Sequence, residues 1–210
     1  MPRALEVGDR LGETPGGDGR RLRRERNRRA VVVSLLQLYS EDRLRPSSAE
    51  VAERAGLSPR SLFRYFEDVN DLAAAAIEAA RADAEPLLAL AATAGDPFAA
   101  RVAALAAGRR ALFEQIGPAA RAARVFEAEQ PMVARGLAEG RRFLRAQVAQ
   151  LFAAELNGPA SASQLAAVDV ATSFEAWELL RRDQRLNAVR AQAVMETALT
   201  LLLSPVPIPR

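Results

Sequence analysis

Apolar residues recur three and four positions apart along nearly the whole chain, which is the spacing of one face of an α-helix. Val32, Leu35, Leu36 and Tyr39 show it first. The same spacing predicts helices over residues 47–55, 58–66, 69–86, 96–116, 131–156, 163–182 and 186–203, with a short one through 125–126. Strand-like alternation rich in Val, Thr and Tyr is missing from the sequence. The pattern therefore predicts an all-α protein.

The stretch SSAEVAERAGLSPRSLFRYF, residues 47–66, carries the most specific local signals. Ser47 with Glu50 three residues later is a capping box, in which each side chain bonds the backbone N–H of the other. Gly56 follows the last apolar residue, where a left-handed residue ends a helix. Ser58 and Pro59 are a good N-cap and a good first helical residue. Helix, tight turn and second helix form a helix-turn-helix.

The second helix of this motif has two distinct faces. Leu62 and Phe66 lie four residues apart and are expected to face the core. The outward side of the helix is expected to present Arg60, Ser61, Arg64 and Tyr65.

Turn residues divide the remainder of the chain. We expect Asp96 to cap a helix with Pro97 at its first position, and Gly117-Pro118 to end that helix. Pro131 should open the long helix that follows it. The Gly-rich residues 1–19 are predicted to be a disordered tail, 20–72 a helix-turn-helix DNA-binding domain and 73–205 a helical regulatory and dimerisation domain.

Charge is distributed unevenly along the chain. The net charge is only +3, but residues 20–66 contain 12 Arg and 5 acidic residues, which is a local excess of 12 − 5 = 7 positive charges. Seven of these Arg lie within residues 20–29, RRLRRERNRR. Such a basic segment indicates an anionic polymer as the partner, and an arm of this kind reaches phosphates or the minor groove.

Composition excludes several chemistries. The chain contains no Cys and no His, so it lacks the thiolate nucleophile and the commonest general base and metal ligand. We therefore predict no catalytic residues, no metal, no cofactor and no enzyme activity. An apolar run long enough to span a membrane is missing, as is a hydrophobic signal peptide, so we expect a cytoplasmic protein that does not associate with membranes.

At this point the sequence resembles the TetR family of transcriptional regulators. The resemblance covers about residues 24–72 and rests on Ser47, Val51-Ala52, Ala55-Gly56-Leu57-Ser58, Ser61-Leu62-Phe63, Tyr65-Phe66 and Leu72. The remaining residues are similar only in the number and length of their helices. The resemblance implies a homodimer that places its third helices in successive major grooves of a palindromic operator on double-stranded DNA.

The resemblance also implies roles for individual residues. It implies that Ser47 and Ser58 cap helices and contact phosphate. Arg60, Ser61 and Arg64 would face base edges, and the Tyr65 hydroxyl would contact a phosphate. Together with Pro59, Phe63, Arg24 and Arg28, these residues form the predicted DNA-binding surface. Phe63 stands where the family usually has Tyr, and Val69-Asn70 where it usually has Lys-Glu. Two phosphate contacts are thereby absent, and the Arg run of residues 20–29 is a hypothetical replacement.

The helical body contains aromatic residues that are predicted either as plain core or as the wall of a ligand pocket. The pocket candidates are Phe113, Phe126, Phe143, Phe174 and Trp177. Pairing of the last two helices with their copies would cover an apolar strip of Ala167, Val170, Ala171, Phe174 and Ala198. The favoured function is a dimeric repressor released by a small apolar ligand. A ligand-independent regulator, an activator, and a helical adaptor that binds protein remain alternatives.

Overall fold

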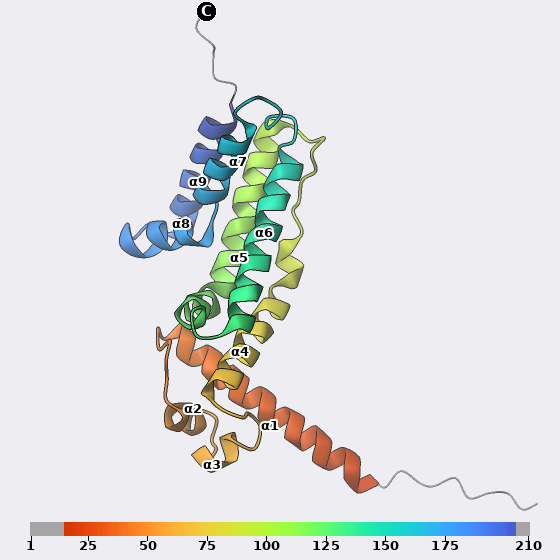
Figure 1. The fold of residues 1–210 in the computed structure, drawn as a ribbon, viewed down its shortest axis with the longest axis vertical. Helices are drawn as coiled ribbons and strands as arrows, with labels where there is room; N and C mark the ends of the chain where they lie inside the picture. The colour runs from red at the N-terminus through yellow and green to blue at the C-terminus, as the bar shows by residue number, and fades with distance from the viewer. Residues whose placement is uncertain (1–14, 205–210) are drawn as a thin grey trace, which may run out of the picture.

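The computed structural model describes residues 15–204, and within them every regular element is a helix, as the apolar spacing predicts. Nine α-helices occur in this part of the chain, with a 3-10 turn η1 and a π-helical turn η2 (Figure 1). They are α1 Pro15–Ser40, α2 Ser48–Arg54, α3 Pro59–Leu62, α4 Val69–Asp83, η1 Glu85–Leu88, α5 Phe98–Phe126, α6 Pro131–Leu151, α7 Ser161–Ala171, α8 Phe174–Glu178, η2 Leu179–Asp183 and α9 Ala188–Leu203.

Helices α1 to α3 form one end of the molecule, and α4 leads from them into the body (Figure 1). The core of this end is built from the inward faces of α1, α2 and α4 with Leu62 and Phe66. Leu62 is fully buried and Phe66 is 2% exposed, so the predicted inward orientation of these two residues is confirmed. Ala122 of α5 belongs to the same core, which joins the helix-turn-helix end to the body.

Helix α1 begins at Pro15, earlier than the sequence predicts. Residues 15–19, which the sequence predicts as part of the disordered tail, belong to this helix, while residues 1–14 and the predicted non-helical tail 205–210 lie outside the described residues. The fixed φ of Pro suits the first position of a helix, whereas the glycines that follow it are poor helix formers, and the good helix formers begin with the Arg run at residue 20. The N-terminal half of α1 extends away from the body (Figure 1).

Helix α5 runs without interruption through Gly117 and Pro118. The predicted break there is wrong, and so is the separate short helix through residues 125–126. Proline inside a helix removes one hydrogen bond and costs about 3 kcal/mol. Here Gly117 is buried and Ala119, Ala120, Ala122 and Ala123 are buried just after Pro118, so tertiary packing offsets that local cost.

The predicted helix over residues 163–182 is interrupted instead. Thr172 donates its hydroxyl to the Val168 carbonyl, Ser173 donates to the Val170 carbonyl, and the Ser173 hydroxyl also accepts from the Ala176 N–H. These side chains satisfy the end of α7 and cap the start of α8, which is why the chain turns between them. The α8 helix and η2 then project sideways from α7 and α9 (Figure 1).

The prediction that Asp96 caps α5 is wrong. Its carboxylate accepts from the backbone N–H and the hydroxyl of Thr93, and Pro97 occupies the N-cap position of α5. The turn before α5 is therefore closed by a side chain that bonds backward along the chain rather than forward.

Candidate nucleic-acid interface and interior pocket

The helix-turn-helix contains the predicted caps in the predicted places. Ser47 and Glu50 form the complete capping box, and Ser58 caps α3 by accepting from the Ser61 N–H at 3.2 Å. Gly56 has a φ of 66°, the left-handed conformation that lets α2 end and the chain turn toward α3. Local side-chain chemistry thus determines the geometry of this turn.

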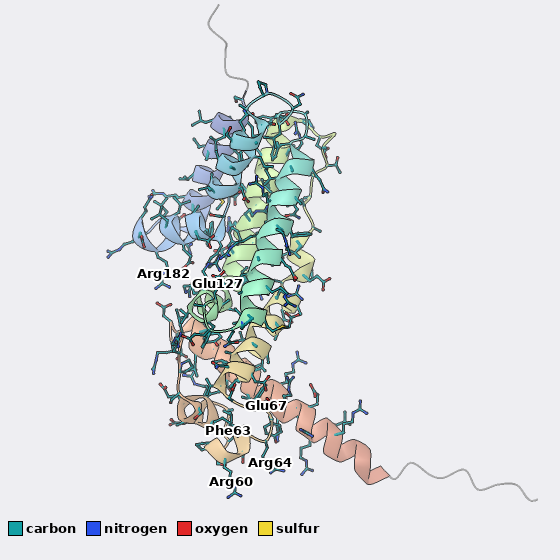
Figure 2. All side chains as sticks on the ribbon, in the orientation of Figure 1. Arg60, Phe63, Arg64, Glu67, Glu127 and Arg182 are labelled. Atoms are coloured by element: carbon teal, nitrogen blue, oxygen red, sulfur yellow. The ribbon has the colours of Figure 1, made fainter. Side chains whose placement is uncertain are left out.

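Helix α3 is shorter than predicted, because its regular part ends at Leu62. Phe63 to Tyr65 continue as turns, with the Arg64 N–H bonded to the Ser61 carbonyl and the Tyr65 N–H to the Leu62 carbonyl. Arg60, Phe63 and Arg64 lie at the free end of the molecule, with their side chains directed outward (Figure 2). Residues 59–66 are called the recognition segment below.

The recognition segment presents two arginines that no carboxylate neutralises. Other arginines at this end are engaged within the chain: Arg43 with Glu50, Arg54 with Glu41, and Arg45 with Glu129. Across residues 15–204, by contrast, no salt bridge involves the exposed side chains of Arg60 and Arg64, which remain free to bind an anion.

The remaining predicted DNA-binding residues lie in different surroundings. Ser47 and Pro59 are exposed, and Ser58 is exposed with its hydroxyl 2.9 Å from that of Ser61, which is half-buried. Phe63 is 46% exposed. Arg24 is exposed on the projecting half of α1.

Two residues of α1 turn toward the recognition segment rather than toward solvent. The Asn27 side-chain amide donates to the Tyr65 hydroxyl at 3.0 Å. The guanidinium carbon of Arg28 lies 5.0 Å from the centroid of the Phe66 ring, in cation–π geometry. Tyr65, predicted to contact phosphate, therefore has its oxygen engaged by α1, and Arg28 is half-buried.

The loop after α1 is bound to the body by ion pairs. Asp42, which has a φ of 65°, pairs with Arg182 of η2 and with the Nε of Arg121 in α5 at 3.2 Å. Arg45 donates to the Val125 carbonyl at 3.0 Å and lies 5.0 Å from the centroid of the Phe126 ring. These contacts connect the helix-turn-helix end to α5 and η2 of the body.

We expect Asp42→Asn to lose stability only where the Asp42 carboxylate is ionised. The hydrogen bond from Arg182 and, secondarily, Arg121 lower the pKa of Asp42 to about 2, against the opposing effect of partial burial. Because the folded-state pKa lies below the ordinary value, the contribution is present above about pH 4 and lost as pH falls through about 2. The half-exposed pair should be worth less than about 1 kcal/mol. Thermal unfolding at pH 7, 5, 4 and 3 should show a difference from the parent protein that shrinks toward acid.

Asp83→Asn, at another exposed carboxylate in the part of the chain that the structure describes, should show no such difference. A stability loss for Asp42→Asn that stays constant down to pH 3 would contradict this account of the Asp42 pairs.

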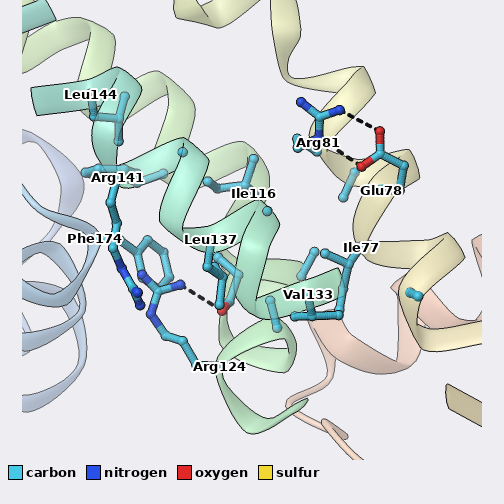
Figure 3. Close-up of a pocket in the computed structure, with 18 of the residues that line it drawn as sticks. Ile77, Glu78, Arg81, Ile116, Arg124, Val133, Leu137, Arg141, Leu144 and Phe174 are labelled. Atoms are coloured by element: carbon cyan, nitrogen blue, oxygen red, sulfur yellow. Dashed lines mark hydrogen bonds and ion pairs between the residues drawn. The ribbon is translucent and has the colours of Figure 1, made fainter. Parts of the chain in front are cut away.

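A cavity of about 740 Å³, open to the surface of the body, lies between α4, α5, α6 and the α7–α8 junction (Figure 3). Its wall is mainly apolar, with Ile77 from α4, Phe113 and Ile116 from α5, Val133, Leu137 and Leu144 from α6, and Phe174 from α8. Gly136 and Gly140, one turn apart on α6, leave open space along this wall. A volume of this size fits a small organic molecule.

Charged groups along the cavity are mostly paired with one another. Arg81 pairs with Glu78 at 2.6 Å, and Arg124 pairs with Glu175 at 2.6 Å while lying 4.2 Å from the centroid of the Phe174 ring (Figure 3). Burial raises the pKa of Glu175, but Arg124 and then Arg141 hold that pKa below its ordinary value. Because the charges are paired, the wall is best suited to a ligand that is largely apolar.

Only part of the predicted pocket set lies at this cavity. Phe113 and Phe174 line it, with their ring centroids 5.6 Å apart in an edge-to-face arrangement. Phe126 is buried beneath Arg45, Trp177 is buried in the core, and Phe143 is 45% exposed, so these three lie outside it. The α4 wall and the two glycines are not among the residues predicted from sequence, although the helical spacing of Gly136 and Gly140 indicates open space on one face of α6.

Two further observations bear on the chemistry of the chain. Within residues 15–204, no cluster of three acidic side chains is placed to hold a metal ion. None of the helices in this range combines the length and apolarity needed to cross a membrane.

The chain is similar to known proteins in its fold but not in its sequence. No family model matches the sequence, and no curated protein matches it significantly. A transcriptional regulator from Rhodococcus sp. Rha1 has a similar structure, with a TM-score of 0.66 at 18% identity, covering 86% of this chain and 99% of that one. A protein from Mesorhizobium loti MAFF303099 assigned to the TetR family has a TM-score of 0.57 at 14% identity, covering 87% and 97%.

A second Rhodococcus protein assigned to the TetR family has a TM-score of 0.59 at 18% identity, covering 85% of this chain and all of that one. The chain has the TetR-regulator fold. The similarity extends over the body as well as the helix-turn-helix, whereas the resemblance in sequence was confined to about residues 24–72. The same fold therefore occurs here at only 14–18% sequence identity.

Proposed function

We propose that this chain is a sequence-specific DNA-binding transcriptional regulator of the TetR family. The observation that carries the proposal is the recognition segment, which presents Arg60 and Arg64 without carboxylate partners at the free end of a TetR fold. Arginine bridges O6 and N7 of guanine in the major groove, and an α-helix fits that groove. Residues 20–72 act as the DNA-binding domain and 73–205 as the regulatory and dimerisation domain.

The active form is a homodimer that uses the face of α7 to α9. Val189 is 63% exposed and Leu201 73%, and apolar residues of α9 exposed to this degree favour burial against a second copy. Val170 of α7 is 68% exposed and also lines the mouth of the cavity. Phe174 is 5% exposed and does not belong to the outward strip that the sequence predicted. A two-fold dimer places two recognition segments on half-sites about one helical turn apart, roughly 34–36 Å.

The cavity is the proposed effector site of a repressor. A small apolar ligand that fits the body better in another spacing of the recognition segments would draw the protein off its operator, by no more than its difference in affinity for the two states. A ligand-independent regulator or an activator with the same DNA-binding end stays the alternative. The absence of His and Cys argues against a helical enzyme.

Selection of binding sites from random DNA tests the proposal, followed by gel shifts on the selected site and on DNA upstream of the chain's own gene. A palindromic consensus bound by two chains is the expected result. No enriched sequence, and no shift up to micromolar protein at moderate salt, would exclude a DNA-binding regulator and favour a protein-binding adaptor.

Removal of residues 1–24 should weaken operator binding and reduce its dependence on salt. This deletion takes away exposed Arg21, Arg23 and Arg24 from the projecting half of α1. Each lost phosphate contact lowers the slope of log K against log salt by about 0.9. A reduction of about 1–3 in that slope is expected, measured by fluorescence anisotropy between 50 and 300 mM salt. An unchanged affinity and slope would show that the Arg run does not replace the phosphate contacts absent at Phe63 and Val69.

A further inference from the structure

Arg28 contacts both the cavity and the recognition segment. Among the residues that line the cavity within the described part of the chain, Arg28 is the only one from α1. It enters at the end nearest the helix-turn-helix, where Asp71, Ala74 and Ala75 of α4 also line the wall.

The other side of the Arg28 side chain contacts the end of the recognition segment. Its guanidinium carbon lies 5.0 Å from the centroid of the Phe66 ring, and Phe66 is 2% exposed. The preceding residue, Asn27, donates to the Tyr65 hydroxyl at 3.0 Å. Any displacement of this turn of α1 therefore acts on Tyr65 and Phe66, directly after the base-reading Arg60 and Arg64.

Arg28 differs from the other arginines of the cavity in what holds it. Arg81 is fixed by Glu78 at 2.6 Å, Arg124 by Glu175 at 2.6 Å and Arg141 by Glu127 at 3.0 Å. No salt bridge to Arg28 occurs among residues 15–204, and the carboxylate of the nearby Asp71 accepts the Glu67 N–H at 3.1 Å. The position of Arg28 is thus set by the aromatic ring of the recognition segment rather than by a fixed countercharge.

We propose that Arg28 transmits occupancy of the cavity to the recognition segment. The inference rests on the proposed function and specifies how the effector site acts on DNA binding. Atoms that fill the end of the cavity push the guanidinium off the Phe66 ring, and the recognition segment loses the contact that holds its C-terminal end against α1. Loss of one cation–π contact accounts for at most about a 30-fold change in operator affinity.

A side chain built into the cavity tests this without knowledge of the natural ligand. A Cβ at Gly136 meets no atom within 4 Å, so Gly136→Phe is expected to place its ring in the cavity without a clash. Operator dissociation constants are measured for the parent, Gly136→Phe, Arg28→Met and the double variant, with circular dichroism to show that each is folded. Arg24→Met with and without Gly136→Phe is the matched control, since Arg24 lies one turn earlier on α1 and outside the cavity.

We expect Gly136→Phe to weaken operator binding about 10-fold in the parent and in Arg24→Met, but less than about 2-fold in Arg28→Met. An equal effect of Gly136→Phe in the parent and in Arg28→Met would overturn the role of Arg28 while leaving an effector site intact. If Gly136→Phe folds and leaves operator binding unchanged, the cavity does not regulate DNA binding, and both the effector site and the role of Arg28 are refuted. If the parent binds no operator, the proposed function itself fails.

Discussion

Replacing Arg60 by alanine is expected to weaken binding to the selected operator by about 1–3 kcal/mol while weakening binding to random DNA far less. Arg60 follows Pro59 in the first turn of α3, is exposed, and forms no salt bridge within residues 15–204. A base-reading arginine loses its hydrogen bonds to one base pair when truncated, so specificity at that position should relax. Fluorescence anisotropy on operator, on single-position operator variants and on random DNA would measure both effects.

Arg142→Ala is the matched control for Arg60→Ala. Arg142 is an exposed arginine on α6, in the body and away from the recognition segment, so its loss should change neither affinity nor specificity. An equal loss on operator and random DNA for Arg60→Ala would assign Arg60 to phosphate contact. Base reading would then rest on Arg64 and Ser61.

Replacing Glu155 by leucine is expected to lower the free energy of unfolding by about 3 kcal/mol. Its partner Arg101 has a side chain only 7% exposed and is paired with Glu155 at 2.6 Å. The Arg101 guanidinium carbon lies 5.7 Å from the centroid of the Phe98 ring and 5.2 Å from that of the Phe152 ring, and these two rings pack edge-to-face beside it. Without Glu155 the buried cation would keep only the carbonyls of Asp96 and Leu151.

Arg109→Met is the contrasting substitution two turns along the same helix. Arg109 is 2% exposed, donates only to the Leu144 carbonyl and the Gln147 amide oxygen, and leaves its Nε without a partner in the described residues. Burial lowers its pKa to about 10. Among the described residues no carboxylate forms a salt bridge with Arg109, and the charge of Asp169 offsets only part of that desolvation. An apolar side chain of similar length should therefore leave stability unchanged or raise it by about 1 kcal/mol.

Urea unfolding of both variants would measure this contrast. Since both sites lie in the body, each folded variant should still bind the operator. A loss below about 1 kcal/mol for Glu155→Leu, or a loss above about 2 kcal/mol for Arg109→Met, would contradict the roles assigned to these two arginines.

The sequence by itself determined the helical class and the helix-turn-helix, down to the Ser47–Glu50 capping box, the left-handed Gly56 and the Ser58 cap. Such features depend on side chains and backbone groups within about four residues of one another, so their chemistry can be read locally. The inward positions of Leu62 and Phe66 follow equally from helical spacing.

Only the tertiary structure decided whether α5 continues through its Gly-Pro pair, where the cavity lies and which arginines of the Arg run are exposed. Gly117-Pro118 reads as a break, but packing of the buried alanines around it keeps α5 continuous. The cavity could not be predicted from its aromatics, because it depends on which faces of α4, α5 and α6 meet. Arg24 and Arg28 look alike in the Arg run. In the structure Arg24 is exposed on α1, whereas Arg28 lies between the cavity and Phe66, a residue about 40 positions away in the sequence.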